Sequence, residues 1–199
     1  AHFIRNDSVT EDADIIARYS EIKYNIYRRT FDPEEHTFSA PELVYDAASI
    51  GKSATLPRIS PCGRYLLFTQ GDDGCFHIWH PEADLYLMDL ASGTVNPLKE
   101  ANSAFAESYH SWSSNGRWIL FSSRRDDSNY TRLYIAYFDT QGKAHKAFAI
   151  PQEDPAFYHH YLRSYNVPEF MIEPVSISPQ EFAAAAKKEA IQANYKEAK

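Results

Sequence analysis

A strand and the turn before it occur twice in this sequence. The stretch PRISPCGRYLLFTQ (57–70) returns as HSWSSNGRWILFSS (110–123), with Gly63 and Gly116 in the same place 53 residues apart. Further along, DLYLMDLASG (84–93) returns as RLYIAYFDTQG (132–142), at an offset of 48 residues from Leu85 to Leu133. A period of about 50 residues with several short strands in each copy is typical of β-propeller blades. The repeat therefore predicts similar sheets that bury their faces against one another.

Each full copy divides into four predicted strands. In the hairpins SPCG and SSNG, a terminal glycine supplies the positive φ of a tight turn. A partial blade precedes the two copies, with a helical turn at 11–19 and no recognisable first strand. The predicted strands are 2–7, 21–32 and 39–47, then 56–60, 64–70, 84–90 and 94–98, then 108–113, 117–123, 131–139 and 144–150.

These strands predict an all-β fold, a partial β-propeller of about three four-stranded blades with a C-terminal helical extension. We place the blades within residues 1–150, as a partial blade at 1–47 and full blades at 56–98 and 108–150. The extension comprises residues 151–199. In it, Asp154 and Pro155 predict the start of a short helix that runs to about Ser164. Ser178 and Glu181 form a predicted capping box before an Ala-rich helix.

Composition limits the partners of this chain. Aromatic residues make up 15% of the sequence, which favours strands because aromatic rings pack well on pleated surfaces. The formal net charge is -7, so nucleic acid and anionic membrane surfaces are not expected partners. No apolar run reaches the roughly 20 residues of a membrane-spanning helix, and we expect a signal peptide to be absent or already removed.

Only two cysteines are present, Cys62 and Cys75. They are too few for a disulfide scaffold, and an extended strand between them would hold them roughly 26 Å apart. We therefore favour free thiols, and cysteine usage leaves the cellular compartment open.

The stretches RISPCGRYLLFTQ (58–70) and SWSSNGRWILFSSRRDDSNYTRLYIAYFD (111–139) resemble the WD40-like (PD40) propeller repeats of TolB-type proteins. That motif reads Trp-Ser-Pro-Asp-Gly-Arg, then an apolar strand ending in Phe and Ser, then Leu-Tyr, an Asp and a Gly turn. Cys62 departs from it where Asp or Asn is expected. The stretch PQEDPAFYHHYLRSYNVPEF (151–170) also resembles the C-terminal end of uncharacterised TolB-like envelope proteins of Bacteroidetes type.

The resemblance implies a secreted, periplasmic or lipid-anchored parent protein that works by binding. It covers about residues 20–150 and marks strand ends and turns rather than a reactive group. TolB-type propellers close with six blades, whereas this chain supplies at most about three. Either further blades belong to a longer protein, or two copies form a homodimer that completes a six-bladed ring.

The insertion GDDGCFHIWH (71–80) is the first candidate recognition loop, because loops at the rim of a rigid propeller carry binding residues. Its candidate residues are Asp72, Asp73, His77, Trp79 and His80. In a strand, the two histidines would point to opposite faces, so one metal held by both requires a bent loop. A calcium role for the two aspartates is open, although a plain turn is favoured and no other cofactor is predicted.

The equivalent loop of the next blade, SSRRDDSNYTR (122–132), supplies Arg124, Arg125 and Tyr130 as further candidates. We favour pairing of its arginines with the neighbouring aspartates or with an adjacent blade over an anion site. Tyr130 is a candidate aromatic anchor for an interface. His110 is predicted to pack in the core and to hydrogen-bond to the next blade.

No Gly-x-Ser-x-Gly, Gly-rich phosphate loop, paired-Cys motif or His-Glu-x-x-His occurs, which lowers the expectation of an enzyme. The favoured function is a non-catalytic binding or scaffolding module of the bacterial cell envelope that recognises a protein or glycan through its rim loops. The alternative is a hydrolase or lactonase-like propeller enzyme, or a subunit of one, with a metal in its channel.

Overall fold

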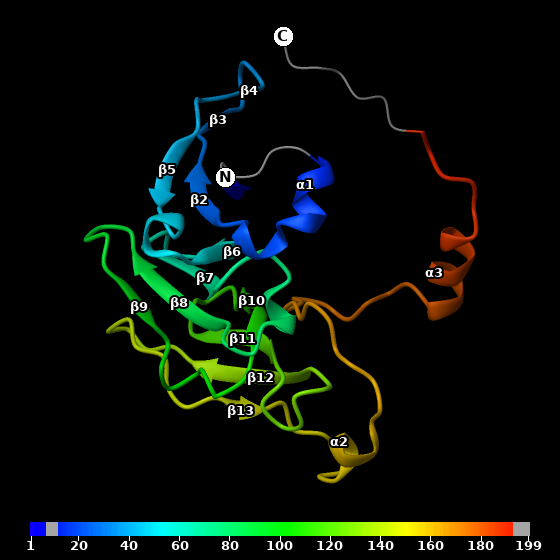
Figure 1. Ribbon diagram of the computed structural model, residues 1–199. Helices are drawn as coiled ribbons and strands as arrows, with labels where there is room; N and C mark the ends of the chain where they lie inside the picture. Colours follow the sequence, from blue (N-terminus) through cyan, green and yellow to red (C-terminus); the bar gives the residue numbers. More distant parts are fainter. Residues whose placement is uncertain (7–11, 193–199) are drawn as a thin grey trace.

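The computed structural model describes residues 1–6 and 12–192, and shows three antiparallel sheets that follow one another along the chain (Figure 1). A two-stranded hairpin, β3 and β4 (Phe31–Asp32 and Thr37–Phe38), projects from the first sheet. The protein is an all-β partial propeller, as predicted. The first sheet has the order β1-β2-β5 (His2–Asn6, Tyr24–Arg28, Glu42–Tyr45), the second β6-β7-β8-β9 (Ser53–Ile59, Tyr65–Gly71, Asp84–Asp89, Val95–Pro97) and the third β10-β11-β12-β13 (Glu107–Trp112, Trp118–Ser123, Arg132–Tyr137, Phe148–Ala149).

The sheets meet through the first strand of each four-stranded sheet, which we call the leading strand. Leading strand β6 packs on β1 and β2, and leading strand β10 packs on β6, β7 and β8. Strands β1 and β2 therefore hold the same positions in the first sheet as β7 and β8 hold in the second, because each pair is contacted by the leading strand of the following sheet. The first sheet therefore has no leading strand among the described residues, in agreement with the sequence prediction.

Strand β7 is buried along its whole length because a sheet lies on each side of it. Leu66 and Phe68 point into the core shared with the first sheet, together with Ile26. Tyr65 and Leu67 point into the core shared with the third sheet. This two-sided burial explains why the segment YLLF (65–68) is continuously apolar rather than alternating.

Both leading strands carry the same bulge. The pairing register shifts between Thr55 and Arg58 in β6 and between Ser108 and Ser111 in β10. Within each bulge one residue has a positive φ, 54° at Leu56 and 51° at Tyr109. Such a backbone costs a residue with a Cβ about 1 kcal/mol or more, and a β-bulge redirects the side chain that it carries.

The helices are shorter than predicted. Helix α1 spans Asp12–Ala17 and α3 spans Pro179–Ala186. No helix in the described residues is long and apolar enough to cross a membrane. The capping box of Ser178 and Glu181 is present as predicted. Residue 7 of the first predicted strand, residue 11 of the predicted helical turn and residues 193–199 of the predicted extension lie outside the described part of the chain.

Helix α2 spans only Phe157–His160, and its N-cap is Ala156, which makes no side-chain cap. The predicted cap at Asp154 is therefore wrong. Its carboxylate accepts a hydrogen bond from the Ala156 N–H and forms a turn before the helix starts.

The last strand, β13, contains two residues, because after a single bridge between Phe138 and Ala144 the chain leaves the sheet edge.

The extension covers the outward face of the third sheet. In the second sheet, Thr69 lies 3.2 Å from Ser108, in leading strand β10 of the next sheet. Ser122 holds the equivalent place in the third sheet, and its hydroxyl donates to the Asn166 carbonyl at 2.7 Å. Tyr165 also donates its N–H to the Thr131 carbonyl. The extension thus lies where the leading strand of a following sheet would be.

Arg132 fastens this extension. Its side chain is buried and donates to the carbonyl oxygens of Arg163 at 2.7 Å and Tyr161 at 2.9 Å. The guanidinium also lies within 6 Å of the ring centres of Tyr130, Tyr158 and Tyr161, which are separated from it by 5.1, 5.5 and 5.9 Å. Cation–π attraction and charge-assisted hydrogen bonds therefore act together at one residue.

Replacing Arg132 with methionine should release the extension without unfolding the sheets. Methionine keeps apolar volume but leaves the carbonyls of the extension without their donor. Trypsin should then cleave after Arg163 at least tenfold faster, while the midpoint of global unfolding moves little. The matched control is R28M, because Arg28 forms an exposed ion pair with Glu42. Equal cleavage rates in R132M and R28M would show that Arg132 does not hold the extension.

Candidate functional site

The loop that follows β7 presents two exposed aromatic side chains at the rim. Residues His77–Trp79 form a single 3-10 turn, which holds the loop in a compact shape. Phe76 is 61% exposed and Trp79 is 66% exposed. Exposed aromatic side chains that lie together, rather than singly, mark candidate interaction surfaces.

His77 lies beneath the loop rather than on its surface. It is 1% exposed, with one ring nitrogen 2.9 Å from Thr55 Oγ1 and the other 3.1 Å from the Asp73 carbonyl oxygen. Burial lowers the pKa of His77 to about 4, so the ring is neutral at neutral pH. Its position supports the loop, and it does not join a rim surface.

His80 lies beside His77, in contrast to the opposite faces expected for a strand. The 3-10 turn brings their ring centres to 5.4 Å, with the rings edge to face. His80 Nδ1 also lies 3.2 Å from a carboxylate oxygen of Glu82. Among the residues that the structure describes, no group of three or more His, Cys, Asp or Glu side chains is arranged to hold a metal ion.

Both aspartates of the loop have local partners, Asp73 through its backbone carbonyl oxygen and Asp72 through its carboxylate and its carbonyl oxygen. Asp72 forms an ion pair with Lys52 at 2.5 Å, and the hydrogen bond from Lys52 lowers the pKa of this carboxyl group. Lys23 donates to the Asp72 carbonyl oxygen. Lys23 directly precedes β2 of the first sheet and Lys52 directly precedes β6 of the second, so these contacts hold the loop against the start of both strands. The cysteines are free, with Cys62 exposed and Cys75 partly buried.

Arg124 meets the exposed tryptophan from the third sheet. Its guanidinium carbon lies 4.4 Å from the centre of the Trp79 ring. Two of its nitrogens donate to carbonyl oxygens, to Asn129 at 3.0 Å and to Ile78 at 3.4 Å. The third nitrogen, Nε, is buried and has no hydrogen-bond partner among the described residues. Arg124 is therefore held in place by two carbonyl groups, and its Nε–H is a buried donor that these bonds do not use.

A pocket of about 370 Å³ lies next to this stack. Its walls come from three parts of the chain, the loop after β7, the third sheet and the extension. We call it the rim pocket, and its main lining residues are Phe76, Trp79, Tyr109, Arg124, Tyr165 and Asn166. Tyr109 is the bulge residue of β10, so the strained backbone places an aromatic ring in the pocket wall.

Arg125 and Tyr130 do not line the rim pocket. Arg125 forms an ion pair with the fully buried Glu107 at 2.9 Å and covers the Tyr134 ring at 4.3 Å. Tyr130 packs on Arg132, as described above. Arg125 thus links strands β10, β11 and β12 of the third sheet, whereas Tyr130 packs on the arginine that holds the extension. Of the eight residues predicted from the sequence, the pocket brings together Trp79 and Arg124.

No protein-family model matches this sequence, and no curated protein matches it. Among solved structures, TolB from Acinetobacter baumannii is similar, with a TM-score of 0.41 and 21% identity over 62% of this chain and 26% of that chain. The β-propeller domain of the Trilobed protease from Pyrococcus furiosus gives a TM-score of 0.36 and 18% identity, over 66% of this chain and 36% of that chain. The Pyrococcus horikoshii acylaminoacyl peptidase gives 0.35 and 17%, over 66% and 21%.

The matched region thus spans about a quarter of the TolB chain and about a third of the Trilobed protease propeller domain. The order of the strands and the packing between the sheets define the partial propeller.

Proposed function

We propose that this protein is a non-catalytic binding module that recognises a protein partner through the rim pocket. The observation that carries the proposal is the stack of Arg124 on Trp79 beside a preformed pocket. Tryptophan, tyrosine and arginine dominate the binding energy of protein interfaces, and they act from positions that the surrounding structure holds rigid. A glycan is the alternative partner, and the same aromatic residues suit it.

The proposal includes a place in the bacterial cell envelope, in the periplasm or on a lipid-anchored parent. Its support is the resemblance of the repeated motifs at 58–70 and 111–139 to TolB-type repeats. This is an analogy at the level of fold and motif, and it says nothing about the identity of the partner.

Partner capture by crosslinking in the native host tests the proposal. A photo-crosslinking amino acid at position 76 should give one discrete crosslinked protein, because Phe76 is exposed at the mouth of the rim pocket. The same amino acid at position 31, in the exposed β3–β4 hairpin, should not give this product. The same product from both positions, or no product from position 76, argues against the rim pocket.

Trp79→Ala should weaken binding of that partner about 30-fold, which corresponds to about 2 kcal/mol at an interface hot spot. The affinity can be measured by calorimetry with the purified pair. Phe31→Ala is the matched control, because Phe31 is also an exposed aromatic residue, at 45%, and should leave the affinity unchanged. An affinity change below twofold in W79A would place the binding surface elsewhere.

The propeller-enzyme alternative makes a different prediction. A hydrolase or lactonase-like site with a metal in the channel requires a stoichiometric divalent ion, calcium included, in the purified protein. Elemental analysis after dialysis decides this, and one bound ion per chain would favour the enzyme.

A homodimer that completes a six-bladed ring also stays a prediction. Because the extension covers the outward face of the third sheet, closure through that face requires the extension to leave it. A solution mass of twice the 22.8 kDa of one chain, measured by light scattering, would support the ring. The Arg132→Met variant should then contain more dimer than the unmodified protein.

A further inference from the structure

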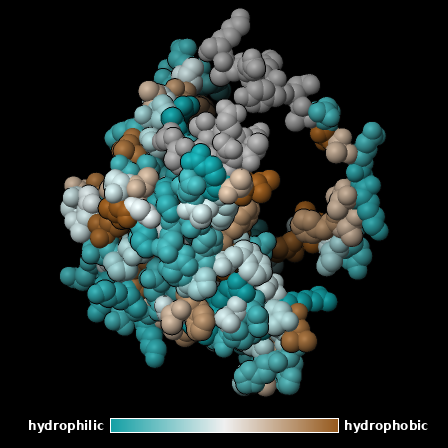
Figure 2. All heavy atoms as spheres, viewed as in Figure 1, coloured by the Kyte–Doolittle hydropathy of each residue, from teal (hydrophilic) through white to brown (hydrophobic). Residues whose placement is uncertain are grey.

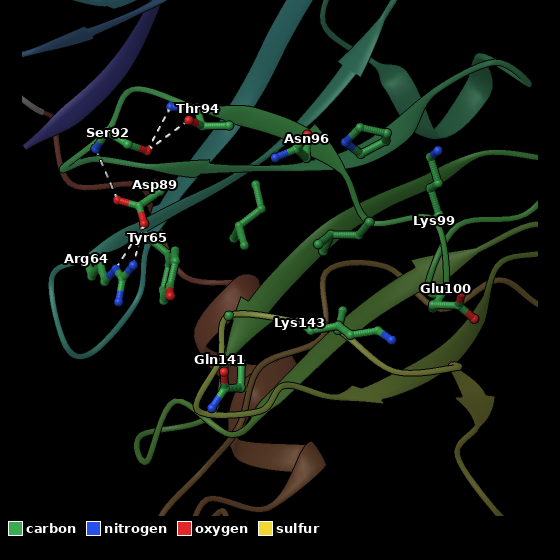
Figure 3. Close-up of a pocket in the computed structure, with 15 residues that line it drawn as sticks. Arg64, Tyr65, Asp89, Ser92, Thr94, Asn96, Lys99, Glu100, Gln141 and Lys143 are labelled. Atoms are coloured by element: carbon green, nitrogen blue, oxygen red, sulfur yellow. Dashed lines mark hydrogen bonds and ion pairs between the residues drawn. The ribbon is translucent and has the colours of Figure 1, made fainter.

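A second and larger depression lies between the second and third sheets, and we call it the sheet groove (Figure 3). Its volume of about 610 Å³ is within the range of small-molecule sites. Tyr65 at the start of β7 lies in its floor, whereas the rim pocket lies beyond the other end of that strand. The two sites are therefore separated by the length of a strand, roughly 20 Å.

The floor of the sheet groove is apolar and carries one hydroxyl group. Leu87, Leu98 and Ala144 are buried there, and Tyr65 is 8% exposed. The Tyr65 hydroxyl makes no hydrogen bond within the described part of the chain. A side chain in place of Gly142 would clash with this hydroxyl. Because Gly142 has no side chain, the Tyr65 hydroxyl has room beside it in the lining of the groove.

The walls carry polar side chains whose hydrogen-bonding capacity is unused. Asn96 comes from one wall and Gln141 from the other (Figure 3). Neither side chain makes a hydrogen bond within the described part of the chain. Planar amides such as these offer a donor and an acceptor side by side. They suit a ligand that carries neighbouring hydroxyl groups.

The charge of the sheet groove differs from the charge of the whole chain. The net charge of the protein is -7. In the groove, Arg64 is already paired with Asp89 at 2.8 Å. Lys99 and Lys143 line the groove without an ion pair inside the described ranges, and Glu100 is the remaining carboxylate in the lining. The groove thus offers two ammonium groups to a negatively charged ligand.

We propose that the sheet groove binds an acidic saccharide, a sugar that carries a carboxylate. The C–H face of the ring would lie on the apolar floor, and its hydroxyls would bond to Asn96, Gln141 and the Tyr65 hydroxyl. The carboxylate would pair with the ammonium group of Lys99 or of Lys143. This site shares no lining residue with the rim pocket, so the inference is independent of the proposed partner.

Calorimetry with digalacturonate and with the neutral disaccharide of the same linkage tests this proposal. Digalacturonate should bind, and its binding should weaken as salt is raised because the lysines are exposed to solvent. The K99Q/K143Q variant should bind it at least tenfold more weakly. K146Q is the matched control, because Lys146 is exposed in the same segment but outside the groove, and it should bind normally.

A second variant tests the sugar-specific contacts. N96A/Q141A should bind digalacturonate at least threefold more weakly, although it retains both lysines. Equal binding of the neutral disaccharide would overturn the requirement for an acid. Inorganic phosphate that binds as tightly as digalacturonate would overturn the requirement for a sugar. No binding of digalacturonate at millimolar concentration would overturn the site, and circular dichroism confirms that each variant is folded.

Discussion

Replacing Arg125 with alanine should lower the free energy of unfolding by about 3–5 kcal/mol, because it leaves a buried carboxylate without its counter-ion. That carboxylate is Glu107, at the start of β10, which is 0% exposed. It accepts hydrogen bonds from Arg125 at 2.9 Å and from the hydroxyls of Ser103 and Ser123, both at 2.7 Å. Once the guanidinium is removed, only neutral donors remain around a buried negative charge.

The stacking of Arg125 contributes to the same loss. Its guanidinium carbon lies 4.3 Å from the ring centre of Tyr134 and 5.6 Å from that of Phe121. Arg125→Lys keeps the charge but loses the planar group, so we expect an intermediate loss of stability.

Urea unfolding followed by tryptophan fluorescence measures this effect. Arg163→Ala is the control, because Arg163 is an exposed arginine whose side chain makes no ion pair in the described residues, and it should change stability by less than about 0.5 kcal/mol. In E107Q/R125M the buried charge is also removed, so this variant should recover part of the stability lost in R125A. A loss below 1 kcal/mol in R125A would mean that Glu107 does not depend on Arg125.

Acid should destabilise the protein well above the pH at which most carboxylates become protonated. Burial lowers the pKa of His77 to about 4 and also lowers the pKa of His110 to about 4. In the unfolded chain both histidines would titrate near 6.5. Between these values the unfolded state binds more protons, so stability falls as the pH falls. Each histidine contributes a loss of up to about 3 kcal/mol by pH 4.

Asp84 acts in the opposite direction. Burial, with a smaller effect from the nearby Glu107, raises the pKa of Asp84 to about 6. Between pH 6 and about 4 the folded state therefore binds more protons at this group, which stabilises it as the pH falls. Because Asp84 is half-buried, solvent screening limits this gain to about 1–2 kcal/mol. The expected net loss between pH 7 and pH 4 is about 4 kcal/mol.

Nuclear magnetic resonance of the imidazole protons tests the cause directly, since both rings should stay neutral down to about pH 5. Urea unfolding at pH 7, 6, 5 and 4.5 tests the consequence. H77Q/H110Q should flatten the dependence on pH, whereas D84N should make it steeper. A ring that titrates near its ordinary pKa in the folded protein would remove that histidine from the explanation.

The fold was predictable because the repeat is a strand-level pattern. The glycine hairpins at Gly63 and Gly116 place the same turn in both sheets, and both glycines have a positive φ, 74° and 65°. His110 is buried, so its predicted place in the core is confirmed, but its ring lies 3.3 Å from the Leu67 carbonyl oxygen of the preceding sheet rather than of the next one. The glycine turns are determined by short-range chemistry, whereas the His110 contact follows from the packing of two repeated sheets against each other.

The site was only partly predictable. Trp79 and Arg124 were found because each lies in a loop that follows an equivalent strand. Tyr109 was missed because a positive φ at a tyrosine leaves no signal in the sequence. Tyr165 was missed because its place depends on contacts between residues more than 30 positions apart, such as that of Thr131 with Ser164. His77 was predicted to lie on the rim, because the sequence of a short 3-10 turn does not differ from that of an exposed loop. The turn in fact buries its side chain.

Helix α3 lies away from the sheets (Figure 1), and apolar side chains gather on that part of the surface (Figure 2). Phe182 in this helix is 56% exposed. The part of the extension that does pack, residues 157–169, follows β13 in the chain and is therefore synthesised after the whole third sheet. Until it emerges from the ribosome, the outward face of that sheet, including Leu120, is open to other nascent chains. At about 5–20 residues per second this interval lasts on the order of seconds. The order of synthesis thus makes the third sheet the place where chaperone binding during translation should matter most.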